Sequence, residues 1–275
     1  MVDLPAVLSR PGATLRYADA GGGGAGVVLI HGAGVDHAMW EPQRQALSRA
    51  GHRTVVWDLR GHGRSRLQPG VRFRAADALD DLAVLLEATG LTSPVLVGHS
   101  LGGNLGQAFV RRHPERVRGL VVVDATWNTG PLRPAERVGL RLAAPLLALV
   151  PASRLPELMA RASAVTPEGI GYARSVFAAM PKAGFLDVWR ATASLVEPEE
   201  GYRTPVPLAL VRGARDRTGN IASAMPRWAR AEGVDEQVVA AAGHLVTLDA
   251  PDATSRTLLR LLEQWGAEDR PTAQK

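Results

Sequence analysis

The chain has 275 residues, of which 46% are hydrophobic and 21% are charged, with no cysteine and a formal net charge of +5. This length can bury one large α/β core with an insertion, and the lack of cysteine excludes disulfides, thiolate metal sites and a cysteine nucleophile. The positive charge comes from arginines scattered along the chain, which favours a solvated surface over nucleic-acid binding. With no signal-peptide pattern and no uncharged stretch of membrane-spanning length, we expect a cytoplasmic protein without a membrane partner.

The first part of the chain alternates short apolar runs with helical patterns. Residues 6–9 and 14–18 predict two strands paired across a turn that contains proline and glycine. The glycine run 21–24 predicts a flexible turn, because no helix opens after it as a phosphate loop would require. Further strands are predicted at 26–30, 54–57, 94–97 and 119–123, and helices at 42–50, 75–88 and 104–112.

The alternation of strands and helices stops between residues 126 and 198, where helical patches separated by prolines replace the strands. This segment is too long for a loop in a compact domain. It therefore predicts a helical cap of residues 126–198 inserted in a core domain of residues 1–125 and 199–275. The patches cover 135–149, 154–162, 168–180 and 185–195.

The α/β pattern resumes after the insertion, with strands predicted at 207–211 and 236–240 and helices at 221–232 and 250–264. Strands that alternate with helices indicate a mostly parallel sheet with helices on both faces. The last residues, 268–275, are expected to fray.

One apolar strand joins a helix directly through the pattern Gly-x-Ser-x-Gly at residues 98–102. So sharp a turn strains its central residue and crowds the crossing backbones, and glycine at Gly98 and Gly102 relieves the crowding. Taken alone, the five residues also fit a glycine-rich turn without chemistry. The strain is nevertheless typical of a turn that holds a side chain out at its tip, so the pattern predicts that Ser100 is a nucleophile.

Nearly the whole chain resembles the α/β-hydrolase family, in particular its members with an inserted lid. The resemblance rests on the Gly-x-Ser-x-Gly pattern, on the turn His31-Gly32-Ala33-Gly34, and on Asp216 and His244, which follow predicted strands in the family's order. It implies the α/β-hydrolase fold, with a central sheet of about eight strands, and a catalytic triad of Ser100, His244 and Asp216.

The residue types fit this chemistry. A serine hydroxyl is a weak nucleophile near neutral pH and needs a base within hydrogen-bond reach, for which a neutral imidazole is suited. We expect His244 to be this base, because the side chain of His99 should diverge from that of its neighbour Ser100. Asp216 is expected to accept a hydrogen bond from the second ring nitrogen and to stabilise the imidazolium.

Two other aspartates compete for the role of the acid. Asp124 ends the strand that follows the elbow helix, a position that some members of the family use. Asp249 lies close to the start of the last helix and is expected to be its N-cap.

The negative charge that develops on a carbonyl oxygen needs N–H donors already aimed at it. The N–H of Leu101, at the start of a helix, is one candidate, and the resemblance implies the N–H of Ala33 as the second donor of this oxyanion hole. His31 resembles the family's structural histidine before this loop. Residues 58–65 also resemble the family, where their role is mainly architectural.

A serine at position 100 favours acyl chemistry, since relatives that alkylate a carboxylate carry aspartate there. We expect a hydrolase that cleaves an ester, thioester or lactone of a largely apolar small molecule through an acyl-enzyme, with no metal or organic cofactor. The inserted segment predicts an apolar pocket with few groups that would pair with a highly charged substrate. Its candidate lining residues are Trp127, Leu146, Leu147, Met159, Tyr172, Phe177, Met180, Phe185 and Trp189.

The residues leave other activities open. Carbon–carbon bond hydrolases and cofactor-free haloperoxidase-like proteins share the same triad, and a non-catalytic small-molecule sensor could use the same fold. The expected partner is a small-molecule substrate, and the sequence does not determine the oligomeric state.

Overall fold

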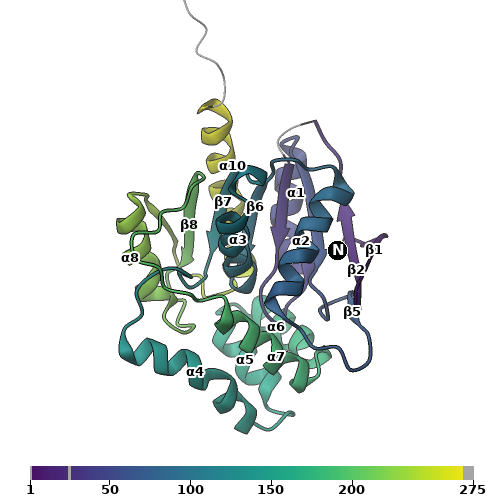
Figure 1. Cartoon of the computed structure of the whole chain (residues 1–275), viewed down its shortest axis with the longest axis vertical. Coiled ribbons are helices and arrows are strands. Elements are labelled where there is room, and N and C mark those ends of the chain that lie inside the picture. Colours follow the sequence, from purple (N-terminus) through teal and green to yellow (C-terminus); the bar gives the residue numbers. More distant parts are fainter. Residues whose placement is uncertain (1, 24–25, 269–275) are drawn as a thin grey trace, which may run out of the picture.

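The computed structural model describes residues 2–23 and 26–268, and within them the strands form one nine-stranded sheet (Figure 1). The order is β1-β2-β4-β3-β6-β7-β8-β9, with β5 paired to β2. The strands are β1 Ala6–Arg10, β2 Ala13–Asp19, β3 Gly26–Ile30, β4 Arg53–Asp58, β5 Arg66–Leu67, β6 Val95–His99, β7 Gly119–Val123, β8 Leu208–Gly213 and β9 Glu236–Val239.

The sheet is parallel from β4 through β3, β6, β7 and β8 to β9, and antiparallel where β2 meets β1, β4 and β5. The central parallel strands are buried along nearly their whole length, as their continuous apolar runs predict. Their carboxyl ends therefore meet at one edge, where loops can bring side chains together.

Helices cover both faces of the sheet (Figure 1). Val27 and Leu29 of β3 pack with Leu47 of α1 and Leu258 of α10. Their neighbour Val28 faces the other way, toward the cluster formed by α2, α3 and α8. The helices of the sheet layers are α1 Glu41–Arg49, α2 Ala75–Thr89, α3 Leu101–Arg112, α8 Ile221–Glu232, α9 Val246–Asp249 and α10 Pro251–Glu268.

Four further helices lie between β7 and β8 in the chain and gather beyond one end of the sheet (Figure 1). We call them the inserted helices: α4 Pro134–Leu149, α5 Leu155–Ser163, α6 Pro167–Ala179 and α7 Lys182–Ser194. The bounds of each helix agree with those of a predicted helical patch to within three residues, because prolines mark the breaks between the helices.

The predicted mostly parallel sheet with helices on both faces is confirmed, with two differences in detail. The two-residue strand β5 was not predicted, because so short a pairing has no periodicity of its own. The predicted last helix 250–264 corresponds to α10, and the four-residue helix α9 before it was not predicted. The predicted turn 21–24 falls partly, and the predicted frayed tail 268–275 almost wholly, outside the described residues.

Candidate active site

Ser100 lies between β6 and α3, with φ 51° and ψ −117°. This left-handed backbone is costly for any residue with a Cβ atom. A Cβ atom on Gly98 would overlap the backbone of Gly102, and one on Gly102 would overlap the carbonyl of Ile30. The N–H of Ser100 donates to the carbonyl of Val123 at 2.9 Å, which keeps the turn attached to β7. The predicted elbow is thus present, with the serine at its strained tip.

His244 and Asp216 meet at the same edge of the sheet. Nδ1 of His244 lies 3.0 Å from Oδ2 of Asp216, and both side chains are buried. Burial acts to raise the pKa of Asp216, but attraction to His244 and the hydrogen bond with it, together with the N–H of Thr218 at 2.7 Å, lower that pKa to about 2. Asp216 is therefore a carboxylate at neutral pH and can fix the orientation of the imidazole.

Ser100 and His244 line one cavity of about 770 Å³. Within the described residues no hydrogen bond joins the two side chains. Hydrogen bonds between catalytic groups often shorten only when substrate is bound, so the shared cavity is the relevant geometry.

Asp124, the competing acid, lies beside this pair. Its Oδ1 accepts a hydrogen bond from the N–H of Gly213 at 2.8 Å, and its Oδ2 is buried without a partner among the described residues. Burial raises the pKa of Asp124 well above its usual range, and repulsion from the Asp216 carboxylate raises it further. Both effects favour the protonated form of Asp124, and the contact with His244 favours Asp216 as its charged partner.

The oxygens of Asp124 and Asp216 and a ring nitrogen of His244 lie within 4.8 Å of one another, close enough to ligate one cation. Nδ1 of His244 and Oδ2 of Asp216 are joined by the 3.0 Å hydrogen bond, which is the arrangement that orients an imidazole.

Two more buried histidines hold the backbone around the candidate site. Nε2 of His99 lies 2.9 Å from the backbone carbonyl of His244 and must carry the proton, because a carbonyl only accepts. In His31, Nε2 accepts from the N–H of Leu59 at 2.9 Å, so Nδ1 donates to the carbonyl of Gly32 at 2.8 Å. Burial lowers the pKa of His31 to about 4 and that of His99 to about 3, so both rings are neutral.

The loop with Ala33 runs beside the elbow. A Cβ atom on Gly32 would lie 2.6 Å from Nδ1 of His99 and 3.2 Å from Cβ of Ser100, so only glycine permits this approach. Ala33 lines the same cavity as Ser100, and Leu101 is the first residue of α3, whose N–H has no acceptor within the helix. Both predicted oxyanion donors thus belong to segments that border Ser100.

The inserted helices form much of the cavity wall. The larger cavity is lined by Leu146, Leu147, Met159, Phe177 and Trp189. A smaller cavity of about 430 Å³ also includes Ser100 and shares Trp189 with the larger one. Some predicted lining residues do other work: Tyr172 donates to the carboxylate of Asp36 at 2.8 Å, and Trp127 stacks on Trp228.

Asp249 is not the predicted N-cap of α10; it ends α9 and reaches across to the inserted helices. Its carboxylate accepts hydrogen bonds from the N–H groups of Val165 and Thr166, from the hydroxyl of Thr166 at 2.8 Å, and from the N–H of Gly243 at 2.9 Å. On the other side of His244, the N–H of Leu245 donates to the carbonyl of Ser163 at 2.7 Å. The His244 loop is therefore tied to the inserted helices on both sides.

Sequence reasoning also missed three arginines. Arg161 of α5 and Arg215 and Arg217, which flank Asp216, line the larger cavity. The prediction of few groups for a charged substrate concerned the inserted segment, to which only Arg161 belongs. The sequence could not show that these three residues reach one cavity, because that depends on how the chain folds.

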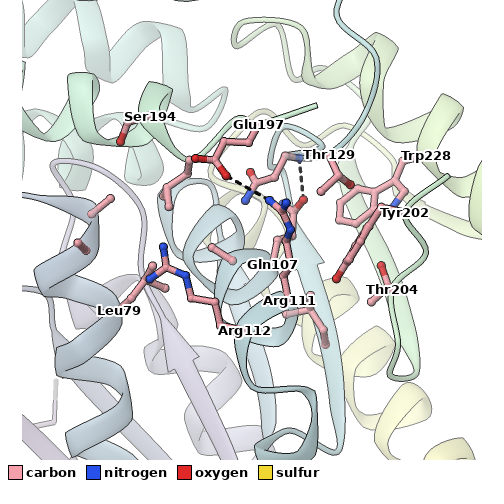
Figure 2. Close-up of a pocket in the computed structure, with 16 residues that line it drawn as sticks. Leu79, Gln107, Arg111, Arg112, Thr129, Ser194, Glu197, Tyr202, Thr204 and Trp228 are labelled. Carbon is pink, nitrogen blue, oxygen red and sulfur yellow. Dashed lines mark hydrogen bonds and ion pairs between the residues drawn. The ribbon is translucent and has the colours of Figure 1, made fainter. Parts of the chain in front are cut away.

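A separate cavity of about 590 Å³ lies at the far end of α3 (Figure 2). Arg111 and Arg112 border it, and Arg111 is paired with Glu197 at 3.1 Å. No predicted catalytic residue lines it, so it is distinct from the candidate active site.

Residues 27–251 match the family model of the α/β-hydrolase fold. The chain belongs to the α/β-hydrolase fold family. Among the described residues, no helix is long and apolar enough to cross a bilayer.

Relatives within this family are matched over part of their length. The chain is 39% identical over 120 residues to a protein assigned as carbamate hydrolase RutD from Variovorax paradoxus (strain S110), covering 44% of this chain and 45% of that protein. It is 35% identical over 119 residues to bifunctional epoxide hydrolase 2 from Sus scrofa, covering 43% of this chain and 21% of that protein. The chain therefore spans less than half the length of these relatives.

Solved structures match over almost the whole chain. A thermophilic esterase from Thermogutta terrifontis is similar with a TM-score of 0.77 and 26% identity, over 96% of this chain and 98% of that one. An enol-lactonase from Burkholderia xenovorans LB400 has a TM-score of 0.76 and 21% identity, over 94% and 100%, which supports the fold alone. The prediction of an α/β-hydrolase enzyme is confirmed.

Proposed function

We propose that the chain is a serine hydrolase that cleaves an ester, thioester or lactone through a triad of Ser100, His244 and Asp216. The observation that carries the proposal is the 3.0 Å contact between His244 and Asp216 at a cavity that also exposes the strained Ser100 elbow. Strain of this kind persists at functional sites because the surrounding structure supports it.

In the proposed first step, Oγ of Ser100 attacks the substrate carbonyl and Nε2 of His244 takes the hydroxyl proton. Asp216 keeps the proton of His244 on Nδ1 and stabilises the imidazolium. The N–H groups of Ala33 and Leu101 stabilise the oxyanion, an interaction whose loss typically costs about 2.7–4 kcal/mol of barrier. His244 then protonates the leaving group, and an acyl-enzyme on Ser100 remains.

In the proposed second step, His244 removes a proton from water, which attacks the acyl-enzyme. The same N–H groups stabilise the second oxyanion, and collapse releases the acid and returns the proton to Ser100. Every proton transfer needs only His244, and no step needs a metal or organic cofactor.

We further propose that residues 126–198 act as a cap over this site. Side chains of α4, α5, α6 and α7 line the larger cavity, which supports an apolar acyl or alcohol group as the ligand. The relatives assigned as carbamate hydrolases fit the same chemistry, because a carbamate also presents a carbonyl carbon to the nucleophile.

The test is turnover of p-nitrophenyl esters, thioesters, lactones and carbamates of graded acyl length by the wild-type protein and by Ser100→Ala. Hydrolysis of at least one carbonyl class that is lost in Ser100→Ala supports the proposal. Halide- and peroxide-dependent oxidation without any carbonyl hydrolysis would instead favour a haloperoxidase-like activity. A folded protein that hydrolyses nothing and binds apolar ligands would favour a sensor.

A further inference from the structure

Three arginines, Arg161, Arg215 and Arg217, line the larger cavity, and among its described lining residues there is no aspartate or glutamate. Arg161 is paired with Glu157, Nε to Oε1, at 2.5 Å. Within residues 2–23 and 26–268, no carboxylate lies within ion-pair distance of Arg215 or Arg217.

The nearest acid in the chain does not neutralise these two guanidinium groups. Asp216 stands between them in sequence, but its carboxylate is buried and bonded to His244 and to the N–H of Thr218. Arg215 and Arg217 are exposed, which leaves their guanidinium groups free to meet a ligand at the cavity.

The smaller cavity also includes Ser100, and no arginine is among its described lining residues. Most of its lining is apolar, including Leu132, Leu140 and Ile221. Its one described acid, Glu136, is engaged, because it accepts from Arg227 at 2.8 Å and from the N–H of Arg133 at 2.7 Å. Ser100 therefore belongs both to a cavity that Arg215 and Arg217 line and to one whose described lining includes no arginine.

We propose that the substrate carries a carboxylate, which Arg215 and Arg217 bind, and an apolar group, which the smaller cavity holds. This inference rests on the proposed function, since it deepens the substrate class of the same site. Guanidinium groups bind carboxylates through charge-assisted and often bidentate hydrogen bonds. Neither guanidinium group has a carboxylate partner among the described residues, so a substrate carboxylate would gain charge-assisted hydrogen bonds that an uncharged substrate would not.

The test measures binding, so that it does not depend on turnover. Phenylalkanoates with chains of three to seven carbons, and the matching phenylalkanamides, are titrated calorimetrically into the Ser100→Ala protein. At 20 mM NaCl we expect the best carboxylate to bind about tenfold more tightly than its amide, a difference of about 1.4 kcal/mol. The preference is expected to shrink at 0.5 M NaCl, because salt screens exposed charges.

Variants identify the groups responsible. Arg215→Gln with Arg217→Gln, in the Ser100→Ala background, is expected to bring the ratio of the two dissociation constants close to one. Arg112→Gln is the control for a lost surface charge, because Arg112 borders the separate cavity at the far end of α3 (Figure 2). This control is expected to keep the tenfold preference.

The inference is overturned if the amide binds as tightly as the carboxylate, if neither binds, or if the preference survives loss of both arginines. If the oxyanion donors and not the arginines bound the carboxylate, the preference would survive in the variant that lacks both arginines. Failure of the proposed function would look different, since wild-type protein would hydrolyse no carbonyl compound whatever the binding data.

Discussion

The strain at Ser100 predicts that removing its side chain stabilises the fold while it abolishes activity. With φ 51° and ψ −117°, Ser100 holds a conformation that glycine adopts freely and other residues adopt at a cost of about 1–3 kcal/mol. Ser100→Gly removes this cost, whereas Ser100→Ala keeps the Cβ atom and therefore the strain. Glycine also raises the entropy of the unfolded chain, which offsets about 0.4–1 kcal/mol.

The net expectation is that Ser100→Gly is more stable than Ser100→Ala by about 0.5–2 kcal/mol. For a chain of this size, that difference raises Tm by about 1–8 °C, which thermal unfolding followed by circular dichroism can measure. The matched control is the same pair at Ser175, exposed within α6, where glycine should be the less stable residue by about 1 kcal/mol. If Ser100→Gly is no more stable to heat than Ser100→Ala, the elbow is not strained as described.

The remaining predictions concern the aspartates near the candidate site and the buried histidines. Asp216→Asn is expected to lower kcat about 10⁴-fold, because the amide favours the wrong imidazole tautomer. Asp124→Asn, which mimics a neutral acid, should keep kcat within a few fold, and ester turnover with the opposite order would contradict the assignment. Asp249→Ala removes the acceptor that joins the His244 loop to the inserted helices, so the free energy of unfolding in urea should fall by about 2–3 kcal/mol. An unchanged unfolding midpoint would show that this contact does not stabilise the fold. Buried neutral imidazoles should make the fold sensitive to acid, because their pKa values in the folded protein lie below the value of 6.5 in the unfolded chain. Their contribution to the stability of the fold is therefore complete above pH 6.5 and is lost as the pH falls toward 4. They are His31, His62 and His99, with pKa values of about 4, 3 and 3. Together they predict that the free energy of unfolding falls by up to about 4 kcal/mol per pH unit in that window. The raised pKa of His37 partly offsets this loss. A free energy of unfolding in urea that is the same at pH 7 and pH 5 would contradict the prediction.

The sequence predicted those features that depend on local pattern. The parallel strands are buried on both faces, so their apolar runs could be recognised without any partner. Gly98 and Gly102 marked the elbow because no other residue fits where two backbones cross. Asp216 and His244 could be expected near Ser100 because the carboxyl ends of parallel strands meet at one edge.

What the sequence could not predict depends on where side chains point. Asp249 looked like a helix cap, because its proximity to α10 was visible and its contact with Thr166, 83 residues away in the chain, was not. The raised pKa of Asp124 follows from complete burial beside Asp216, which no local pattern reveals. The arginines of the larger cavity resemble any other surface arginine in the sequence, and only the fold brings them to that cavity.

The central claim is that Ser100 is an activated nucleophile, and covalent labelling tests it most directly. The wild-type protein is incubated with a fluorophosphonate, and the adduct is located by peptide mass spectrometry. We expect a single adduct on Ser100 that forms within minutes and is absent from Ser100→Ala. A natively folded wild-type protein that forms no adduct, or forms it on another residue, would contradict the account.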